Sequence, residues 1–295
     1  MKEYLTQLQN SDSAVRQRAA WDLGAMGSVA AQPEVIRALT ERLLRDKAWG
    51  VRHAAARALG AMGPAAATPE VIQALVERLL RDKAGGVRRV AGLALGKMGS
   101  VAAQPEVLEA LTERLLRDKV WEVRSAAAKA LGAMGEAAAT REVIQALSQC
   151  LREDEDWVVR RAAAWALGRL LPAHPEALRD FLRALPTPKA LKEVFRDSPG
   201  AVPALRALLS DPDPKIRLRA VWVLGWMGEA AATPEVVRAL LARRLDEDPN
   251  VRTAALKVLR RLPVSSETVS AVLRDIRGDE PEAAEATAWA LERLG

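Results

Sequence analysis

The sequence predicts an all-α fold, an α-solenoid (superhelix) of about nine stacked helix pairs. Three observations predict it: a dipeptide repeats every 36 residues, two segments of each repeat show helical spacing of apolar residues, and proline and glycine mark the helix ends. A single helix pair cannot bury its apolar face alone, whereas stacked pairs share one continuous core. The repeating dipeptides are Val15-Arg16, Val51-Arg52, Val87-Arg88, Val123-Arg124 and Val159-Arg160.

The first helix of each repeat is illustrated by residues 68–80. Pro69 fits the first helical position, where its missing N–H is not needed, and Thr68 is placed to cap. Glu70 lies in the first turn, where a negative charge favours the helix dipole. Apolar residues then recur with a helical period up to Leu80, which predicts one buried face.

The second helix begins near the Val-Arg dipeptide and is rich in small residues. In the second copy, Val51, Ala55, Leu59 and Met62 form one buried stripe. A glycine inside this helix, such as Gly60, costs about 1 kcal/mol relative to alanine. We therefore expect close approach of a neighbouring helix at these glycines, and helix termination at the later glycines Gly63, Gly99 and Gly135.

The period is interrupted once. We expect a single solenoid over residues 1–295, with regular 36-residue repeats in 1–171, an irregular joint in 172–210 and further repeats in 211–295. Helices are expected in the joint near 175–185, 189–196 and 201–209, as a pair with a shortened second helix plus the next first helix. Later copies are marked by Ile216-Arg217 and Val251-Arg252, and by a degenerate copy from Ala283.

The composition, 49% hydrophobic and 28% charged, is typical of a soluble folded protein. Cys150 is the one cysteine, which excludes an intrachain disulfide and a cysteine-based zinc site. His53 and His174 are too far apart in sequence for a local metal motif. The polar start lacks the apolar segment of a signal peptide, and Ala220–Gly228 is among the longest uncharged apolar runs. These features predict a cytoplasmic protein with no metal, no cofactor and no membrane contact.

The pattern Val-Arg-x-x-Ala-Ala-x-Ala-Leu-Gly-x-Met-Gly, preceded by Asp-x-Asp-Pro-x, resembles HEAT-like repeats of the phycobilisome-lyase type. The preceding motif is clearest at 211–217 and 246–252. The long units are also similar to repeat arrays of bacterial NACHT-type signalling proteins, although no ATPase is present in this sequence. The resemblance covers nearly the whole chain. It implies that the Val-Arg helix lines the concave face of the superhelix.

Positive charge gathers on the non-core positions of the Val-Arg helix, which are −2, −1, +2, +3, +6 and +10 relative to the valine. Over eight copies, twelve of these residues are basic and three are acidic, Glu122, Glu282 and Glu285. A surface of one sign attracts partners of the opposite sign. The alternative is that long cationic side chains only solvate a helical face. The basic residues are Arg18, Arg57, Arg89, Lys97, Lys129, Arg161, Arg169, Lys215, Arg219, Lys257, Arg261 and Arg293.

Tryptophan follows the same periodicity. Trp21, Trp165, Trp222 and Trp289 occupy position +6, and Trp226 lies one turn beyond Trp222. Tryptophan beside arginine is the usual composition of a binding hot spot, and it also suits base stacking. Trp289, in the terminal copy, is alternatively a cap of the solenoid. Trp49, Trp121 and Trp157, at position −2, are interpreted as structural rings that cover a turn and pack on the next layer.

Two further residue types are interpreted as structural. The arginine of each Val-Arg dipeptide follows a loop aspartate at a fixed offset, for example Asp46 before Arg52, so the two residue types are expected to pair within or between layers. Cys150 aligns with Arg78 and Arg114 of other copies, which predicts a partly exposed, chemically incidental thiol.

The function predicted from these patterns is a non-enzymatic binding scaffold for an acidic protein or peptide. The alternative is DNA or RNA binding through the same basic face, and an enzyme ranks last because no convergent nucleophile, base or metal set is found. The candidate partner-binding residues are Trp21, Arg57, Arg89, Lys129, Arg161, Trp165, Arg169, Arg219, Trp222, Trp226 and Lys257.

Overall fold

The structure is a computed structural model that describes residues 1–184, 188–275 and 288–289. Within these ranges every regular element is an α-helix or a short 3₁₀ helix. The all-α fold predicted from the repeats is therefore confirmed. The predicted terminal copy from Ala283 lies outside the described residues, except for Ala288 and Trp289.

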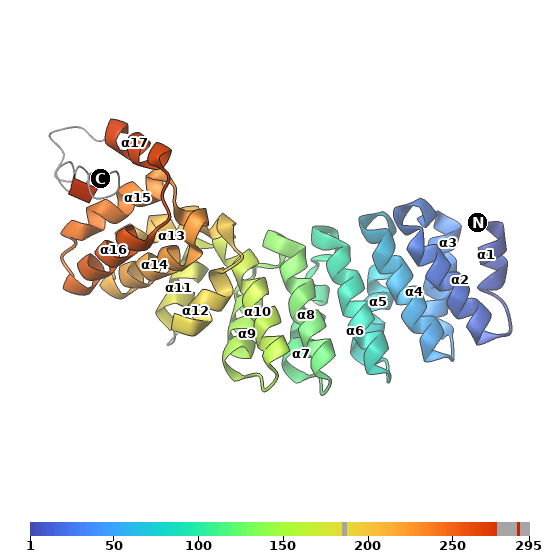
Figure 1. The fold of residues 1–295 in the computed structure, drawn as a ribbon. Coiled ribbons are helices and arrows are strands. Elements are labelled where there is room, and N and C mark those ends of the chain that lie inside the picture. Colours follow the sequence, from blue (N-terminus) through green and yellow to red (C-terminus); the bar gives the residue numbers. More distant parts are fainter. Residues whose placement is uncertain (185–187, 276–287, 290–295) are drawn as a thin grey trace. The chain divides into compact units, whose positions relative to one another are not determined.

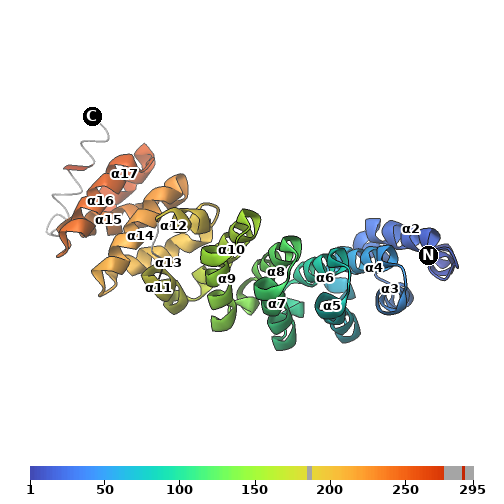
Figure 2. The same cartoon turned by 90° about the horizontal axis from the view of Figure 1, so that it is seen from below.

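Residue contacts divide the chain into two compact units, Met1–Leu170 and Leu171–Gly295, each described by itself. The first unit consists of two rows of helices (Figures 1 and 2). In one row, which holds the Val-Arg dipeptides, the second helices pack side by side: α2 (Ser13–Ala25), α4 (Trp49–Met62), α6 (Gly85–Lys97), α8 (Trp121–Met134) and α10 (Trp157–Leu170). The other row contains the first helices α3 (Pro33–Arg45), α5 (Pro69–Arg81), α7 (Pro105–Arg117) and α9 (Arg141–Glu153); the short α1 (Lys2–Gln7) packs on α2.

The helix ends follow the local signals in the sequence. Pro69 is the first residue of α5, and the Thr68 side chain accepts a hydrogen bond from the backbone N–H of Val71. Gly63 ends α4 with a φ of +62°, a conformation that glycine adopts without the steric cost of a Cβ. Gly63 and the three residues after it form a 3₁₀ turn, η2 (Gly63–Ala66), that leads into the next first helix.

Close approach of neighbouring second helices explains the glycines inside them. A Cβ placed on Gly60 of α4 would lie 2.8 Å from the Cα of Ala94 in α6. A Cβ placed on Gly96 of α6 would lie 2.7 Å from the Cα of Ala130 in α8. The absent side chain thus lets two helix backbones touch, and the packing gained offsets the low helix propensity of glycine.

An Arg–Asp ladder connects successive layers. The Arg52 guanidinium donates to both carboxylate oxygens of Asp82 in the next layer, at 2.7 and 2.9 Å, and its Nη1 also donates to the Asp46 carbonyl of its own loop. Each ladder aspartate in turn accepts from a backbone N–H two residues on, as Asp82 does from Ala84. The predicted pairing is thus found between layers. The bidentate pairs of the first unit are Arg16–Asp46, Arg52–Asp82, Arg88–Asp118 and Arg124–Asp154.

The second unit begins where the 36-residue period ends. Its α-helices are α11 (Pro175–Ala184), α12 (Pro188–Phe195), α13 (Val202–Ala207), α14 (Pro214–Met227), α15 (Pro234–Ala242), α16 (Pro249–Arg261) and α17 (Ser266–Asp275). The three helices expected between 175 and 209 are present, and the last one ends in a 3₁₀ turn, η7 (Leu208–Ser210). α14 packs against α11, α12, α13 and α16, which places it at the centre of this unit.

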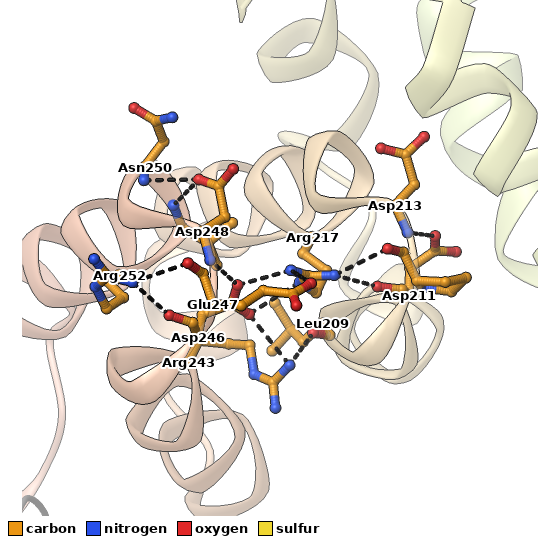
Figure 3. A network of polar contacts seen from close by, with 12 residues as sticks. Leu209, Asp211, Asp213, Arg217, Arg243, Asp246, Glu247, Asp248, Asn250 and Arg252 are labelled. Carbon is orange, nitrogen blue, oxygen red and sulfur yellow. Dashed lines mark hydrogen bonds and ion pairs between the residues drawn. The ribbon is translucent and has the colours of Figure 1, made fainter.

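The Arg–Asp ladder continues in the second unit with altered spacing. Arg217 of α14 donates to both oxygens of Asp246, while its Nη1 donates to the Asp211 carbonyl (Figure 3). Asp211 itself is bound by Arg179 of α11, at 2.6 and 3.2 Å. The shortened helix α12 contains no arginine, so α11 supplies the guanidinium that a second helix supplies in the regular layers.

Candidate functional site

Alternating tryptophan and arginine side chains line one face of α10. Trp157, Arg161, Trp165 and Arg169 follow one another at four-residue spacing, which aligns them along a helix. The Arg161 guanidinium carbon lies 5.0 Å from the Trp157 ring centroid, and that of Arg169 lies 5.3 Å from the Trp165 ring. Both distances fall within the range of cation–π attraction. We call these four residues the α10 stripe.

The α10 stripe is both exposed and held in place. Trp157 and Trp165 leave 59% and 40% of their surface exposed. The Trp165 ring reaches over Gly132 of α8, where an added Cβ would lie 2.6 Å from the ring, and Arg169 Nε donates to the Gly132 carbonyl at 2.9 Å. The glycine therefore makes room for the indole, and the arginine spans two layers. Such prior ordering reduces the entropy lost when a partner binds.

A second aromatic group lies between α2 and α4. The Arg57 guanidinium carbon lies 3.9 Å from the Trp21 ring centroid. The His53 ring is 6.2 Å from Trp21 and 6.3 Å, edge-on, from Trp49. Burial lowers the pKa of His53, and the positive charges of Arg89 and Arg57 lower it further. His53 is therefore neutral at pH 7.

An open hollow of about 240 Å³ lies between α4 and α6, beside this aromatic group. Arg57, Arg89 and Lys97 line it, and none of the three has a carboxylate partner among the described side chains. The hollow is therefore a concentration of uncompensated positive charge. Its complete lining is His53, Arg57, Gly60, Arg89, Val90, Leu93, Ala94 and Lys97. We call it the α4–α6 hollow.

Charge is divided between the two rows of the first unit. The second helices α4, α6, α8 and α10 contain ten arginines and lysines against one acid, Glu122, and three of the ten are paired with ladder aspartates. The first helices α3, α5, α7 and α9 contain nine basic and nine acidic residues. Lys129 of α8 is exposed on the basic row, between the α4–α6 hollow and the α10 stripe in the order of helices.

The candidate residues of the second unit have different surroundings. Arg219 is half-buried, and its Nη1 donates to the carbonyls of Leu182 and Arg183 at the end of α11. Trp222 and Trp226 are also half-buried, with ring centroids 6.4 Å apart. Lys257 is exposed on α16. Contacts within the unit therefore occupy one nitrogen of Arg219 and cover part of both indoles.

The structure changes the interpretation of several residues. Cys150, expected to be partly exposed, is only 4% exposed, and its Sγ lies 3.6 Å from the Leu115 carbonyl. Burial raises the pKa of this thiol to about 12, which removes it from thiolate chemistry. The expectation failed because this position is largely covered: the aligned Arg78 and Arg114 side chains are themselves only 17% and 18% exposed, and the shorter thiol is covered further.

The structural interpretation explains the tryptophans at position −2 only in part. The Trp49 ring does lie near the next layer, 4.0 Å from a Cβ placed on Gly86 of α6. Trp49 and Trp157 are nevertheless 60% and 59% exposed, and Trp121 is 40% exposed. These three belong to the candidate surface. Their spacing of four residues from His53, Ser125 and Arg161 is a signal that places them on the same helix face as position +2. Trp289, by contrast, is 3% exposed, as expected for a cap.

Among the residues that the structure describes, no group of three or more His, Cys, Asp or Glu side chains is arranged to hold a metal ion. No described helix combines the length and apolar composition needed to cross a bilayer.

Comparison with known proteins identifies the repeat type. The family model for HEAT repeats matches residues 2–96, 72–168, 108–191, 189–245 and 202–294. Among curated proteins, no sequence matches this chain significantly.

Two solved structures are similar to this chain. One is the crystal structure of an engineered protein that is 28% identical to this chain. The match covers 77% of this chain and 97% of the engineered protein, with a TM-score of 0.46. The other is a chain in the complex of CpcE and CpcF of phycocyanin lyase from Nostoc sp. PCC7120, and it is 21% identical to this chain. The match covers 99% of this chain and 93% of the chain in the complex, with a TM-score of 0.46.

Proposed function

Because this chain belongs to the HEAT-repeat family, in which stacked helix pairs form a scaffold, we propose that it is a non-enzymatic binding protein for an acidic protein or peptide. The observation that carries the proposal is the α10 stripe, in which two exposed indoles alternate with two guanidinium groups. The neighbouring second helices α8, α6 and α4 add further cations to this row, namely Lys129, Arg89 and Arg57.

Two physical arguments support a protein or peptide partner. Tryptophan and arginine dominate interface hot spots, since each combines a large apolar area with polar contact at its edge. The imbalance of charge on the second helices favours an acidic partner, because a surface of one sign raises the local concentration of the opposite sign.

Nucleic acid is the second candidate partner, and one observation favours it. Trp157 and Trp165 are exposed beside cations, which is the combination that single-strand binders use for base stacking and backbone contact. Binding of this kind weakens steeply with salt, since each phosphate contact releases counterions. A mobility-shift assay with single-stranded and duplex DNA at about 50 and about 200 mM salt separates the candidates.

The test of the acidic-peptide proposal starts from a peptide display library of varied charge, selected on the immobilised full chain. We expect enrichment of acidic peptides that contain apolar residues. Affinity of an enriched peptide is then compared between wild type and the double variant Trp157→Ala, Arg161→Glu, for which we expect at least tenfold weaker binding, since hot-spot truncations cost about 2 kcal/mol or more.

The matched control is Arg117→Glu, which reverses one exposed charge on the first-helix row. This variant should bind the selected peptide within about threefold of wild type, because surface charges outside an interface act weakly. Failure to enrich acidic peptides, or equal binding by the α10 variant and wild type, would contradict the proposal.

A further inference from the structure

The α4–α6 hollow contains cations that the fold does not use. The neighbouring arginines Arg52 and Arg88, on the same two helices, are bound to the ladder aspartates Asp82 and Asp118. Arg57, Arg89 and Lys97 have no such partner among the described residues, although they line one small space. Three like charges repel one another there, so an anion that enters the hollow is stabilised by all three.

Arg57 is ordered before any ligand arrives. Its guanidinium carbon is 3.9 Å from the Trp21 ring, so the indole covers one face of the planar group. The N–H donors of a guanidinium lie in its plane and stay available for an anion. Stacking therefore limits the motion of Arg57 without occupying its hydrogen-bonding capacity.

The number of cations favours a doubly charged ligand. A carboxylate carries one charge, and in the ladder a single bidentate arginine occupies both of its oxygens, with the second arginine 3.6–3.8 Å away. A phosphate monoester carries about two charges at pH 7 and offers three strong acceptor oxygens, which suits two guanidinium groups and an ammonium.

The size of the hollow indicates what carries the phosphate. Sites for small molecules of drug size usually enclose about 300–1,000 Å³, whereas this hollow measures about 240 Å³ and is open. It suits a phosphorylated side chain better than a whole nucleotide. Val90, Leu93 and Ala94 add an apolar wall against which the carbon atoms of such a side chain can pack.

We propose that the α4–α6 hollow binds a phosphate monoester carried by a serine or threonine side chain of the partner. This inference rests on the proposed function, since it identifies one modified residue in the acidic partner. Phosphorylation would then act as a switch, because the same peptide without the phosphate leaves Arg57, Arg89 and Lys97 uncompensated.

The test uses the imidazole signals of the full chain in NMR, because His53 lines the hollow and His174 is the other histidine. The probes are a phosphoserine peptide with neutral flanking residues, the same peptide with serine or glutamate at that position, inorganic phosphate, and adenosine monophosphate. We expect the phosphopeptide to shift His53 and not His174, with at least tenfold tighter binding than the glutamate peptide or inorganic phosphate.

Variants locate the effect. Arg89→Gln combined with Lys97→Gln should weaken phosphopeptide binding at least tenfold, while Arg161→Gln on the α10 stripe should leave it within about threefold of wild type. Circular dichroism of each variant establishes that it is folded.

Three results would overturn the proposal: a His53 signal that does not respond to phosphopeptide, equal affinity for the glutamate peptide, or unchanged binding by the α4–α6 double variant. Tighter binding of adenosine monophosphate than of the phosphopeptide would overturn the assignment of the phosphate to a protein side chain. The two proposals are tested independently, because the α10 variants report on acidic-peptide binding and the His53 signal reports on the α4–α6 hollow. If α10 variants alone lose acidic-peptide binding while the His53 response to phosphopeptide is intact, both proposals are supported at separate sites.

Discussion

The two units of this chain use the same side-chain chemistry for different ends. In the first unit, arginines of the Val-Arg dipeptides bind the ladder aspartates, and other cations such as Arg57 and Arg161 stack on indoles and stay exposed. In the second unit, Arg217 serves the ladder and Arg219 also binds backbone carbonyls of its own unit. The regular unit thus leaves cationic and aromatic groups available to a partner, whereas the irregular unit uses more of them for its own packing.

The difference has a structural cause. Where the 36-residue period holds, each second helix meets an equivalent helix, so position +1 alone completes the ladder. The outer positions are then less constrained, although Arg169 still donates to the Gly132 carbonyl of the neighbouring layer. Where it fails, α14 is packed against helices of unequal length, and Arg219 satisfies carbonyls at the end of α11. Regular repeats therefore free surface residues for recognition.

The ladder gives the largest expected effect. Arg88→Ala leaves the carboxylate of Asp118, which is 1% exposed, without its bidentate partner. We expect a loss of up to about 3–5 kcal/mol in the free energy of unfolding, reduced to the extent that Arg114, 3.6 Å from Asp118, compensates the charge. Arg217→Ala should cost a similar amount in the second unit, since its side chain is 4% exposed. Urea denaturation followed by circular dichroism measures both.

The adjacent residue provides the control. Arg89→Ala removes a cation that has no carboxylate partner among the described side chains, so its effect on the free energy of unfolding should stay within about 0.5 kcal/mol. If Arg88→Ala and Arg89→Ala lower the free energy of unfolding equally, the distinction between arginines that bind ladder aspartates and cations without a carboxylate partner is wrong.

Helix contacts give the next largest effect and distinguish the units. Gly96→Ala places a Cβ 2.7 Å from the Cα of Ala130, so two backbones must separate, and we expect destabilisation of about 1–3 kcal/mol. Gly225→Ala meets both methyl groups of Val258, Cγ2 at 2.6 Å and Cγ1 at 3.2 Å, and no backbone atom. We expect a smaller loss there, because a side chain can shift by a few tenths of an ångström more easily than a helix backbone and alanine also favours the helix. Thermal denaturation of the two variants would refute this account if Gly225→Ala were the more destabilised.

How far the sequence predicts this molecule depends on the kind of residue. The 36-residue period, Pro69 as a helix start and Gly60 as a contact point follow from local rules that recur along the regular unit, although α9 begins at Arg141 without a proline. The Arg–Asp pairing also followed from its fixed offset, although the sequence left open whether it acts within or between layers.

The outer surface was less predictable because exposure depends on neighbours that a repeat pattern does not show. Trp157 and Trp289 are chemically identical, yet the former is 59% exposed and the latter 3%. Arg219 and Arg161 are both basic residues on second helices, but only the former reaches a backbone carbonyl of another layer. Cys150 is buried at a position where the longer side chains of Arg78 and Arg114 are also mostly covered. The curvature that would make the Val-Arg row concave stays a prediction from family resemblance.

Acid should weaken the ladder in both units. Burial by itself raises the pKa of Asp118, but hydrogen bonds from Arg88 and the Val120 N–H, with attraction to Arg88 and Arg114, lower it overall; the pKa of Asp246 is lowered in the same way by Arg217 and its neighbours. A folded-state pKa below the unfolded value of about 3.9 means that the unfolded chain binds more protons, so the stabilisation is present above that pH and is lost as pH falls through the folded-state pKa.

This dependence is measured by urea denaturation between about pH 5 and pH 3. Asp118→Asn removes one titrating group and should show a shallower decline in the free energy of unfolding than wild type. A decline as steep as that of wild type would show that Asp118 does not titrate below its ordinary range.

The smallest expected effect tests whether the free cations of the first unit are uncompensated in solution. Burial and then the charges of Arg89 and Arg57 lower the pKa of His53, so Arg89→Gln should raise that pKa towards its ordinary value of about 6.5. NMR titration of the imidazole measures the change, and Arg161→Gln, on α10, should leave the pKa of His53 unaltered. If Arg89→Gln has no effect on the pKa of His53, the charge of Arg89 is already neutralised. The α4–α6 hollow would then not differ from the second unit in having available cations.

If the expected rise occurs, a bound dianion must also raise the pKa of His53, because it offsets the same positive charges. By reciprocity, protonation of His53 then tightens the binding of that dianion.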